Sequence, residues 1–462
     1  MNTDTMKETQ LHIDKDAVRI YLPDAVRKIL KTLADAGFEA YAVGGCVRDS
    51  LLGKKPNDWD ITTSALPVQV KKLFKRTIDT GIEHGTVTVM MGHEGYEITT
   101  YRIDGIYEDG RHPKEVIFTP SLEEDLKRRD FTINAMAYND TDGLVDLFGG
   151  IADMEARIIR AVGEPKERFS EDALRMMRAV RFAAQLGYEI DEKTQDAIRT
   201  LCGTLEKISA ERIRTEMEKL LISRNPDKFE LFYRLGLSKI FLPEFDRAME
   251  TPQHSPHHCY SVGEHTLVSI KNVPEDRILR LTMLFHDLGK PLCKTTDENG
   301  RDHFYGHPKL SATIAQKRMR ALKFDNAATD MVVTLAEYHD VRPEPTAKAV
   351  RRLLSKLGEE KMRFLMQVQR ADVNAQSDYQ RREKLGRITQ LEQCLDEIIA
   401  GQQCFTIKDL AVDGKDLIEL GYQPGKELGK ELAALLEIVL EEPKENDKEN
   451  LLRIAAQDLT GI

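Results

Sequence analysis

Hydrophobic and polar positions change their period along the chain. Three short runs rich in β-branched or aromatic residues lie near glycines, at 39–43, 86–91 and 96–101, and this pattern predicts strands. From about residue 170 onward apolar residues recur every three or four positions, as at 172–186 and 209–222, which predicts helices. The pattern therefore indicates an α+β fold, with a strand-containing head up to about residue 158 followed by a long all-α body.

Length and composition limit the class of protein. A chain of 462 residues is long enough for two to four domains, and we expect them at 1–158, 159–250, 251–390 and 391–462. The longest apolar runs fall well short of the ~20 residues that a membrane-spanning helix needs. The six cysteines are widely spaced, without a Cys-x-x-Cys pair. We therefore expect a reduced cytoplasmic enzyme that has no membrane partner.

The charge pattern leaves one basic segment open to two interpretations. The chain carries 77 acidic and 67 basic residues, which argues against nonspecific binding to duplex nucleic acid but allows local basic patches. The segment 351–387 holds ten basic and five acidic residues. It is either an RNA-binding patch or a solvated helix face with internal ion pairs, and the charge pattern alone favours the second interpretation.

A glycine pair and two aspartates follow the first predicted strand. Gly44 and Gly45 lie between that strand and a predicted helix at 47–52, where backbone N–H groups can approach a phosphate, although a plain turn has the same pattern. Asp58 and Asp60 are two positions apart, so on a strand they point to the same face. Two such carboxylates repel each other unless a cation such as Mg²⁺ lies between them. Glu97, on the third predicted strand, is a candidate third carboxylate.

The order of these motifs resembles a known family. Gly44-Gly45-x-x-Arg48-Asp49, Asp58-x-Asp60 and the segment 128–134 (Arg-Arg-Asp-Phe-Thr-Ile-Asn) are together similar to tRNA nucleotidyltransferases of the bacterial and eukaryotic type. They are also similar to bacterial poly(A) polymerases, and both groups belong to the DNA polymerase beta nucleotidyltransferase superfamily. The similarity runs from about residue 38 to 220. It implies a polymerase-beta-like head with a mixed sheet, a helical neck that recognises the nucleotide and binds RNA, and template-independent addition of CCA to tRNA from CTP and ATP.

The resemblance also assigns roles to residues. It implies that Asp58 and Asp60 hold catalytic Mg²⁺. The nucleotide-binding residues that it implies are Gly44, Gly45, Arg48, Arg129, Asp130, Asn134, Asp172, Arg175, Arg178 and Arg181. A loop at 104–115 is similar to the family's flexible loop, although this chain has Arg111-His112 where relatives often have two arginines.

Asp172 and Arg175 are candidates for reading the base. We expect a helix that begins with Ser170 as its N-cap and places Asp172 and Arg175 on one face, where an ordinary ion pair is the simplest interpretation. Cytosine and adenine, however, both present an amino donor beside a ring-nitrogen acceptor. A carboxylate accepts from the first and a guanidinium donates to the second. Uracil and guanine present the reverse pattern, and unmet buried polar groups cost about 1–3 kcal/mol each.

A series of histidines and aspartates predicts a second site. His286 and Asp287 end an apolar helical stretch at 281–290, with Gly289 as the expected C-cap, and burial of such groups is costly without a partner. The ordered series His265, His286, Asp287, His307, His339 and Asp372 resembles the HD phosphohydrolase superfamily. That resemblance implies an HD domain at 251–390 with one metal on His265, His286, Asp287 and Asp372, and a second site completed by His307 and His339. The donors suit a transition metal or Mg²⁺. The implied activity is hydrolysis of phosphodiesters or phosphomonoesters, such as 2′,3′-cyclic RNA ends.

The last segment is similar to the tail of tRNA nucleotidyltransferases. Pro424-Gly425 breaks one helix and starts another, and Lys426 and Lys430 are placed to contact tRNA phosphates. Two rival functions stay open: a poly(A) polymerase or A-only enzyme, and an HD hydrolase whose head only binds RNA. The sequence admits a homodimer without requiring one.

Overall fold

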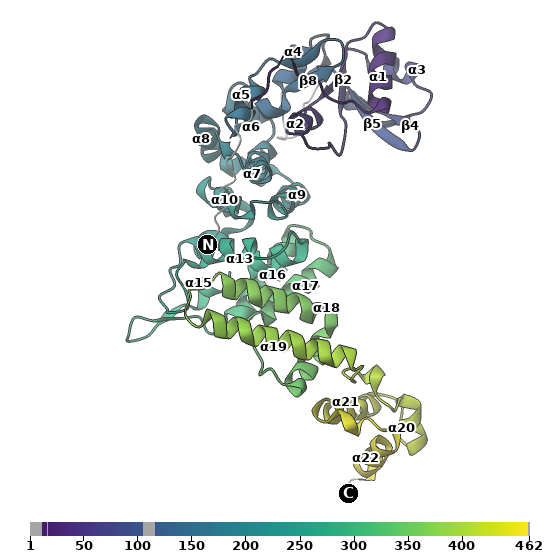
Figure 1. Cartoon of the computed structure of the whole chain (residues 1–462), viewed down its shortest axis with the longest axis vertical. Helices are drawn as coiled ribbons and strands as arrows, with labels where there is room; N and C mark the ends of the chain where they lie inside the picture. The colour runs from purple at the N-terminus through teal and green to yellow at the C-terminus, as the bar shows by residue number, and fades with distance from the viewer. Residues whose placement is uncertain (1–11, 16, 105–115, 461–462) are drawn as a thin grey trace. The chain divides into compact units, whose positions relative to one another are not determined.

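The chain forms two compact units, Met1–Pro243 and Glu244–Ile462 (Figure 1). The structure is a computed structural model, and it describes residues 12–15, 17–104 and 116–460. The segment 105–115, which contains Arg111 and His112 of the expected loop, lies outside these residues. Among the described helices, none combines the length and the apolarity that crossing a membrane requires.

A mixed sheet organises the first unit. Within the described residues it has seven strands in the order β3-β4-β5-β2-β1-β8-β9, and β2 and β5 are parallel while the other neighbours are antiparallel. The strands are β1 Ala40–Val43, β2 Ile61–Thr63, β3 Thr77–Gly81, β4 Thr86–Met91, β5 Glu94–Thr100, β8 Met136–Asn139 and β9 Gly143–Asp146, with β6 Arg102–Asp104 and β7 Val116–Phe118 paired separately. The predicted strands are confirmed as β1, β4 and β5.

Helices of the head pack on this sheet. They are α1 Asp24–Asp35, α2 Gly45–Leu51, α3 Pro67–Leu73, α4 Leu122–Lys127 and α5 Gly150–Glu155. In α1 the buried residues are Val26, Ile29, Leu30 and Leu33, the three-to-four spacing of a helix with one apolar face. Both α1 and α2 contact β1, whose four residues are all buried. The sheet therefore holds the turn after β1 in a fixed position.

The helical part of the first unit begins differently from the prediction. Its helices are α6 Pro165–Glu171, α7 Leu174–Leu186, α8 Glu192–Leu201, α9 Ala210–Leu221, α10 Glu230–Arg234 and α11 Ser238–Phe241, followed by α12 Pro243–Met249. The predicted N-cap is wrong: Ser170 lies inside α6, where its hydroxyl donates to the carbonyl of Lys166. Asp172 instead stands in the break between α6 and α7, and its side chain accepts a hydrogen bond from the N–H of Leu174. The break gives Asp172 an extended backbone that a helix interior would not allow.

Within residues 244–460, which the structure describes, the second unit consists of helices and loops and one short strand pair. Its helices are α13 Val262–Lys271, α14 Arg277–Phe285, α15 Lys290–Cys293, α16 His307–Ala321, α17 Asn326–Tyr338, α18 Ala347–Asn374, α19 Arg381–Ala400, α20 Gly414–Leu420, α21 Lys426–Glu441 and α22 Lys448–Thr460. The pair is β12 Thr295–Thr296 and β13 Asp302–His303. In the first unit, β10 Ile158–Ile159 pairs with β11 Glu189–Ile190. The expectation of an all-α body is therefore slightly wrong.

Apolar cores among the described residues hold this unit together. One includes Leu335, Leu354 and Leu391 from α17, α18 and α19, and another joins α20, α21 and α22. Basic residues of the segment 351–387 take part in this packing: Arg351 is buried and donates to the carbonyl of Leu440, and Arg370 pairs with Glu392 at 2.5 Å. Ion pairing on helices is thus observed in this segment.

Candidate active site and metal centre

Three carboxylates of the first unit converge beside the glycine turn. Asp58 and Asp60 immediately precede β2 and do not lie on it, which corrects the prediction that both stand on a strand. The Asp60 carbonyl accepts a hydrogen bond from the N–H of Val43 (3.0 Å), at the end of β1. In the parallel pairing of β2 and β5, Ile61 lies opposite Ile98, so Asp60 and Glu97 stand at the same level of neighbouring strands. All three acids line one cavity of about 850 Å³.

The electrostatics of this cavity favour a bound cation. Desolvation raises the pKa of Asp60 above its ordinary value and Asp58 adds to the rise, while Arg129 opposes it. Desolvation also raises the pKa of Glu97, and both aspartates contribute. Carboxylates that crowd one another in this way are stabilised in their charged form by a divalent cation. The donor set, which consists of oxygen ligands only, fits Mg²⁺.

The glycine turn is shaped around an arginine. Gly44 has φ +82°, and a Cβ at this position would lie 3.1 Å from Nη1 of Arg129, so a side chain here is both strained and crowded. Arg129 in turn pairs with the fully buried Asp125 (3.4 Å). Arg48, on α2, donates to Oδ1 of Asn134 (2.5 Å). The turn, Arg48, Arg129 and Asn134 therefore form one connected surface of donors beside the carboxylates.

Asp130, Arg178 and Arg181 connect the head to α7 and α9. Asp130 accepts hydrogen bonds from Asn134 (3.1 Å) and Arg178 (2.8 Å). Although burial alone would raise it, the pKa of Asp130 is lowered to about 2, because Arg178 and these hydrogen bonds favour the charged form. Arg181 is 7% exposed and pairs with Glu216 at 2.5 Å. Arg181 thus faces α9 and contacts a buried carboxylate.

Asp172 and Arg175 have separate partners in the structure. Asp172 pairs with Arg212 of α9 (2.7 Å), and Arg175 pairs with Glu171 (2.5 Å) and donates to the carbonyl of Arg128 (3.0 Å). They therefore do not share one helix face as predicted, since Asp172 precedes α7 and Arg175 lies within it. Each group is held by its own neighbours.

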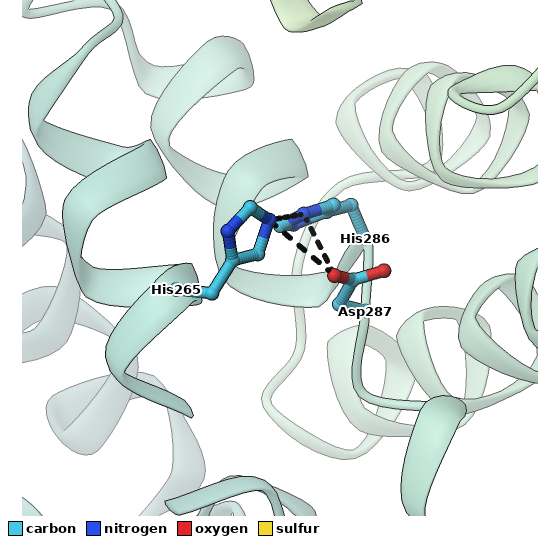
Figure 2. Close-up of side chains that lie close together, drawn as sticks. All are labelled: His265, His286 and Asp287. Carbon is cyan, nitrogen blue, oxygen red and sulfur yellow. Dashed lines mark hydrogen bonds and ion pairs between the residues drawn. The ribbon is translucent and has the colours of Figure 1, made fainter. Parts of the chain in front are cut away.

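The predicted histidine–aspartate series converges in the second unit. His265 comes from α13, His286 and Asp287 from the end of α14, His307 from the start of α16 and His339 from the end of α17. Figure 2 shows His265, His286 and Asp287 with their polar atoms turned toward one another. The Nε2 atoms of His265 and His286 lie 3.5 and 3.3 Å from Oδ2 of Asp287. Those of His307 and His339 lie 3.3 and 3.6 Å from Oδ1 of the same residue.

Hydrogen bonds on the far side of each ring settle where the lone pairs point. The Nδ1 atoms lie against backbone carbonyls of Ala375, Met283, Phe304 and Ala336 at 2.7 to 3.2 Å, so each Nδ1 carries the proton. The neutral Nε2 atoms are then acceptors, yet those of His265 and His286 lie 3.4 Å apart and those of His307 and His339 lie 3.2 Å apart. Acceptors that face each other repel unless a cation lies between them.

Asp287 occupies the centre of this arrangement. Its Oδ2 forms an ion pair with Nζ of Lys290 (2.7 Å), and each of its oxygens faces one pair of histidine rings. Burial would raise its pKa, but the charge of Lys290 holds it well below the usual range. The charged carboxylate offers one oxygen to each histidine pair, and imidazole and carboxylate donors of this kind suit a transition metal or Mg²⁺.

Asp372 joins the first of these groups. Its Oδ1 lies 3.0 Å from Nε2 of His265, and its Oδ2 accepts hydrogen bonds from Arg342 (2.6 Å) and Gln376 (3.1 Å). Burial opposes ionisation, but the charge of Arg342 keeps its pKa well below the usual range.

Sequence reasoning missed several residues around this cluster. Lys290, Arg342 and Lys384 line a cavity of about 380 Å³, which Asp287 also lines. His258 lines this cavity too and lies against the ring of His265. The spacing of Lys290, three residues after Asp287, was a usable signal, but Arg342 and Lys384 have no local pattern.

Gly289 is not the C-cap of α14, whose C-cap is His286. It has ordinary helical angles, and a Cβ there would lie 2.5 Å from a backbone oxygen of His307.

The predicted RNA-binding residues of the tail are exposed on one helix. Lys426 and Lys430 lie one turn apart at the start of α21. The expected break at Pro424-Gly425 separates α20 from α21.

Comparisons with known proteins agree with this geometry. Residues 40–160 match the poly(A) polymerase head domain, residues 187–249 the probable RNA- and SrmB-binding site of polymerase A, and residues 304–455 a putative tRNA nucleotidyltransferase domain 2. The CCA-adding enzyme of Lactobacillus helveticus is 41% identical over 414 residues, which cover 88% of this chain and 91% of that protein. The chain belongs to the CCA-adding enzyme family.

Other relatives and solved structures show the extent of the match. The CCA-adding enzyme of Lactiplantibacillus plantarum is 57% identical over 202 residues, so the match covers 44% of this chain and spans about half (50%) of that protein. The crystal structure of the Bacillus stearothermophilus CCA-adding enzyme in complex with CTP superposes with a TM-score of 0.69 at 32% identity, over 94% of this chain and 96% of that one. The Thermotoga maritima CCA-adding enzyme complexed with tRNA shares the fold, with a TM-score of 0.59 at 21% identity over 95% and 96% of the two chains.

Proposed function

We propose that this chain adds CCA to the 3′ end of tRNA from CTP and ATP, without a nucleic-acid template. The observation that carries the proposal is the convergence of Asp58, Asp60 and Glu97 beside the glycine turn, in a chain that matches a CCA-adding enzyme over 88% of its length. Relatives that were solved with CTP and with tRNA support the choice of substrates.

The residues of the head have distinct tasks in this reaction. Asp58 and Asp60 would hold Mg²⁺, which would lower the pKa of the RNA 3′-hydroxyl and neutralise charge on the α-phosphate and the departing pyrophosphate. Arg48 and Arg129 are positioned beside the glycine turn to bind the triphosphate, and Asn134 orients Arg48 through their hydrogen bond. Such transfer needs positioning and positive charge, and no covalent protein nucleophile.

Selection of the base rests on Asp172 and Arg175. The carboxylate accepts from the amino group of cytosine or adenine, and the guanidinium donates to the adjacent ring nitrogen. Uracil and guanine leave two polar groups unmet, at about 1–3 kcal/mol each, so rejection by several hundredfold is expected. We expect Arg178 to position Asp130, and the exposed Lys426 and Lys430 to contact tRNA phosphates.

Transfer of labelled nucleotides tests the proposal. A tRNA that lacks its CCA end is incubated with Mg²⁺ and with CTP, ATP, UTP or GTP separately and together. The expected result is addition of C, C and A in that order. Asp58→Ala abolishes it, and Asp79→Ala, which removes an exposed acid of β3, leaves it intact. Addition of A alone in every mixture identifies an A-only enzyme or a poly(A) polymerase instead, and Asp58→Ala with full activity refutes the assigned site.

We further propose that the histidine–aspartate cluster is an HD phosphohydrolase centre. This proposal is favoured by Asp287, whose two oxygens face two pairs of imidazole acceptors that need cations between them. Two ions there would activate a water molecule and polarise a phosphoryl group. Lys290 and Arg342 line the cavity and offer positive charge to an anionic substrate.

Hydrolysis of bis-p-nitrophenyl phosphate, measured with Mn²⁺, Ni²⁺, Co²⁺, Zn²⁺ and Mg²⁺ in turn, tests this activity. We expect turnover with at least one metal, and loss of turnover in His286→Ala. The exposed His254 provides a matched control, since His254→Ala removes an imidazole outside the cluster. The absence of hydrolysis with every metal would show that this cluster has only a structural role. CCA addition in the same preparation shows that the protein is folded.

A further inference from the structure

Arg212 forms an ion pair with the base-reading carboxylate from a helix 40 positions further along the chain. Its Nη2 lies 2.7 Å from Oδ2 of Asp172, and its Nη1 lies 3.4 Å from Oδ1. The side chains of Asp172 and Arg212 are 17% and 24% exposed. This partial burial limits screening by solvent, so the ion pair is stronger than an exposed one.

Arg212 lies at a position of α9 where the helix does not stabilise a positive charge, so Asp172 is the group that stabilises it. Arg212 is the third residue of α9, in the first turn, where the partial positive charge of the helix disfavours a cation. The first turn also contains Glu211, the sign of charge that this end of a helix prefers. A cation at this point therefore costs local stability, which its ion pair with Asp172 offsets.

The contacts of Asp172 leave room for a base. A carboxylate has about four lone-pair sites. Arg212 donates to Oδ2 at 2.7 Å and to Oδ1 at 3.4 Å, and the N–H of Leu174 donates to Oδ1 at 3.0 Å. These three bonds fix the plane of the carboxylate, and one lone pair of Oδ2 is left to accept from an amino group. Asp172 lies in the break between α6 and α7, so helix geometry does not fix its orientation.

We propose that Arg212 is a positioning residue for base selection: it fixes the orientation of the Asp172 carboxylate, so that this group accepts only from the amino group of cytosine or adenine. The inference rests on the proposed function, because it assumes that Asp172 reads the base. Without Arg212 the carboxylate keeps one anchor and turns more freely, and the difference between correct and incorrect bases decreases.

Single-nucleotide addition to tRNA lacking CCA tests the inference. We measure kcat/KM for CTP and for UTP in Arg212→Ala, Arg212→Lys and the control Arg214→Ala, which lies on another face of the same helix. We expect Arg212→Ala to reduce the preference for CTP over UTP about tenfold or more. Arg212→Lys restores most of the preference, and Arg214→Ala keeps it within about twofold.

A double-mutant cycle separates positioning from a purely structural role. If Arg212 acts through Asp172, the double variant Asp172→Ala with Arg212→Ala prefers CTP no less than Asp172→Ala alone. A merely structural role lowers the melting temperature of Arg212→Ala and leaves the CTP-to-UTP preference unchanged, which overturns the inference. Full discrimination in Asp172→Ala overturns the proposed reader and the inference together. Loss in Asp172→Ala combined with full discrimination in Arg212→Ala overturns the inference alone.

Discussion

Removal of metal from the histidine–aspartate cluster is expected to destabilise the second unit. The structure places Nε2 acceptors only 3.2 and 3.4 Å apart in two pairs, around a buried carboxylate that pairs with Lys290. These repulsions are present whenever the cations are absent. A chelator such as EDTA therefore removes stabilisation that belongs to the folded state alone.

The magnitude follows from mass action. A cation at a hundred times its dissociation constant stabilises the folded state by about 2.7 kcal/mol. For a unit of roughly 200 residues, about 1 kcal/mol moves the melting temperature by about 2–4 °C, so chelation is expected to lower it by about 5–11 °C. Removing one imidazole weakens the same site, and so the difference between metal-loaded and chelated protein should shrink in His286→Ala.

Differential scanning calorimetry of the full chain with Mn²⁺ and with EDTA measures this difference, and elemental analysis gives the bound metal. We expect one to two ions per chain in this cluster, lost in His286→Ala and kept in His254→Ala. Equal melting temperatures with and without metal, together with no bound metal after gel filtration, would refute the reasoning from facing acceptors.

Three other measurements test the two sites and the lysines of the tail. Gly289→Ala puts a Cβ 2.5 Å from a backbone oxygen of α16, so we expect a loss of about 1–3 kcal/mol in unfolding free energy together with weaker metal binding in the cluster. The raised pKa values of Asp60 and Glu97 mean that the folded head binds protons more readily than the unfolded chain, so their ionisation costs stability as pH rises through those values. Carboxyl NMR titration without metal should show both midpoints above the ordinary range, and Mg²⁺ should lower them; ordinary midpoints contradict the crowding. The double variant Lys426→Ala with Lys430→Ala should weaken tRNA binding without a change in KM for CTP. The slope of the binding constant against salt concentration should fall by the amount that about two phosphate contacts contribute. An unchanged slope would show that these lysines do not contact the tRNA.

The sequence predicted those features that depend on local chemistry. The strands β1 and β4 follow from runs of apolar and β-branched residues, and the helix after Gly44-Gly45 follows from the glycine turn. The histidine–aspartate series could be predicted because its six residues, spread over positions 265–372, are all of the types that bind metals. Buried groups of these types need a partner for their polar atoms.

Features that depend on tertiary contacts could not be predicted in this way. Ser170 is a residue type that is common at N-caps, but α6 begins earlier, at Pro165, and ends just before Asp172. Gly289 has the sequence context of a helix C-cap, but a glycine is required there because the backbone of α16 lies too close for a side chain. Arg212 has no sequence signal at all, since it meets Asp172 only because α9 packs on α7.

Crystals of the chain with CTP and Mn²⁺, examined by anomalous scattering, test the central claim most directly. The account predicts a manganese peak between Asp58 and Asp60 at the triphosphate, with the cytosine amino group on Asp172 and its ring nitrogen facing Arg175. Manganese confined to the cluster around Asp287, or a cytosine that contacts neither Asp172 nor Arg175, would contradict it.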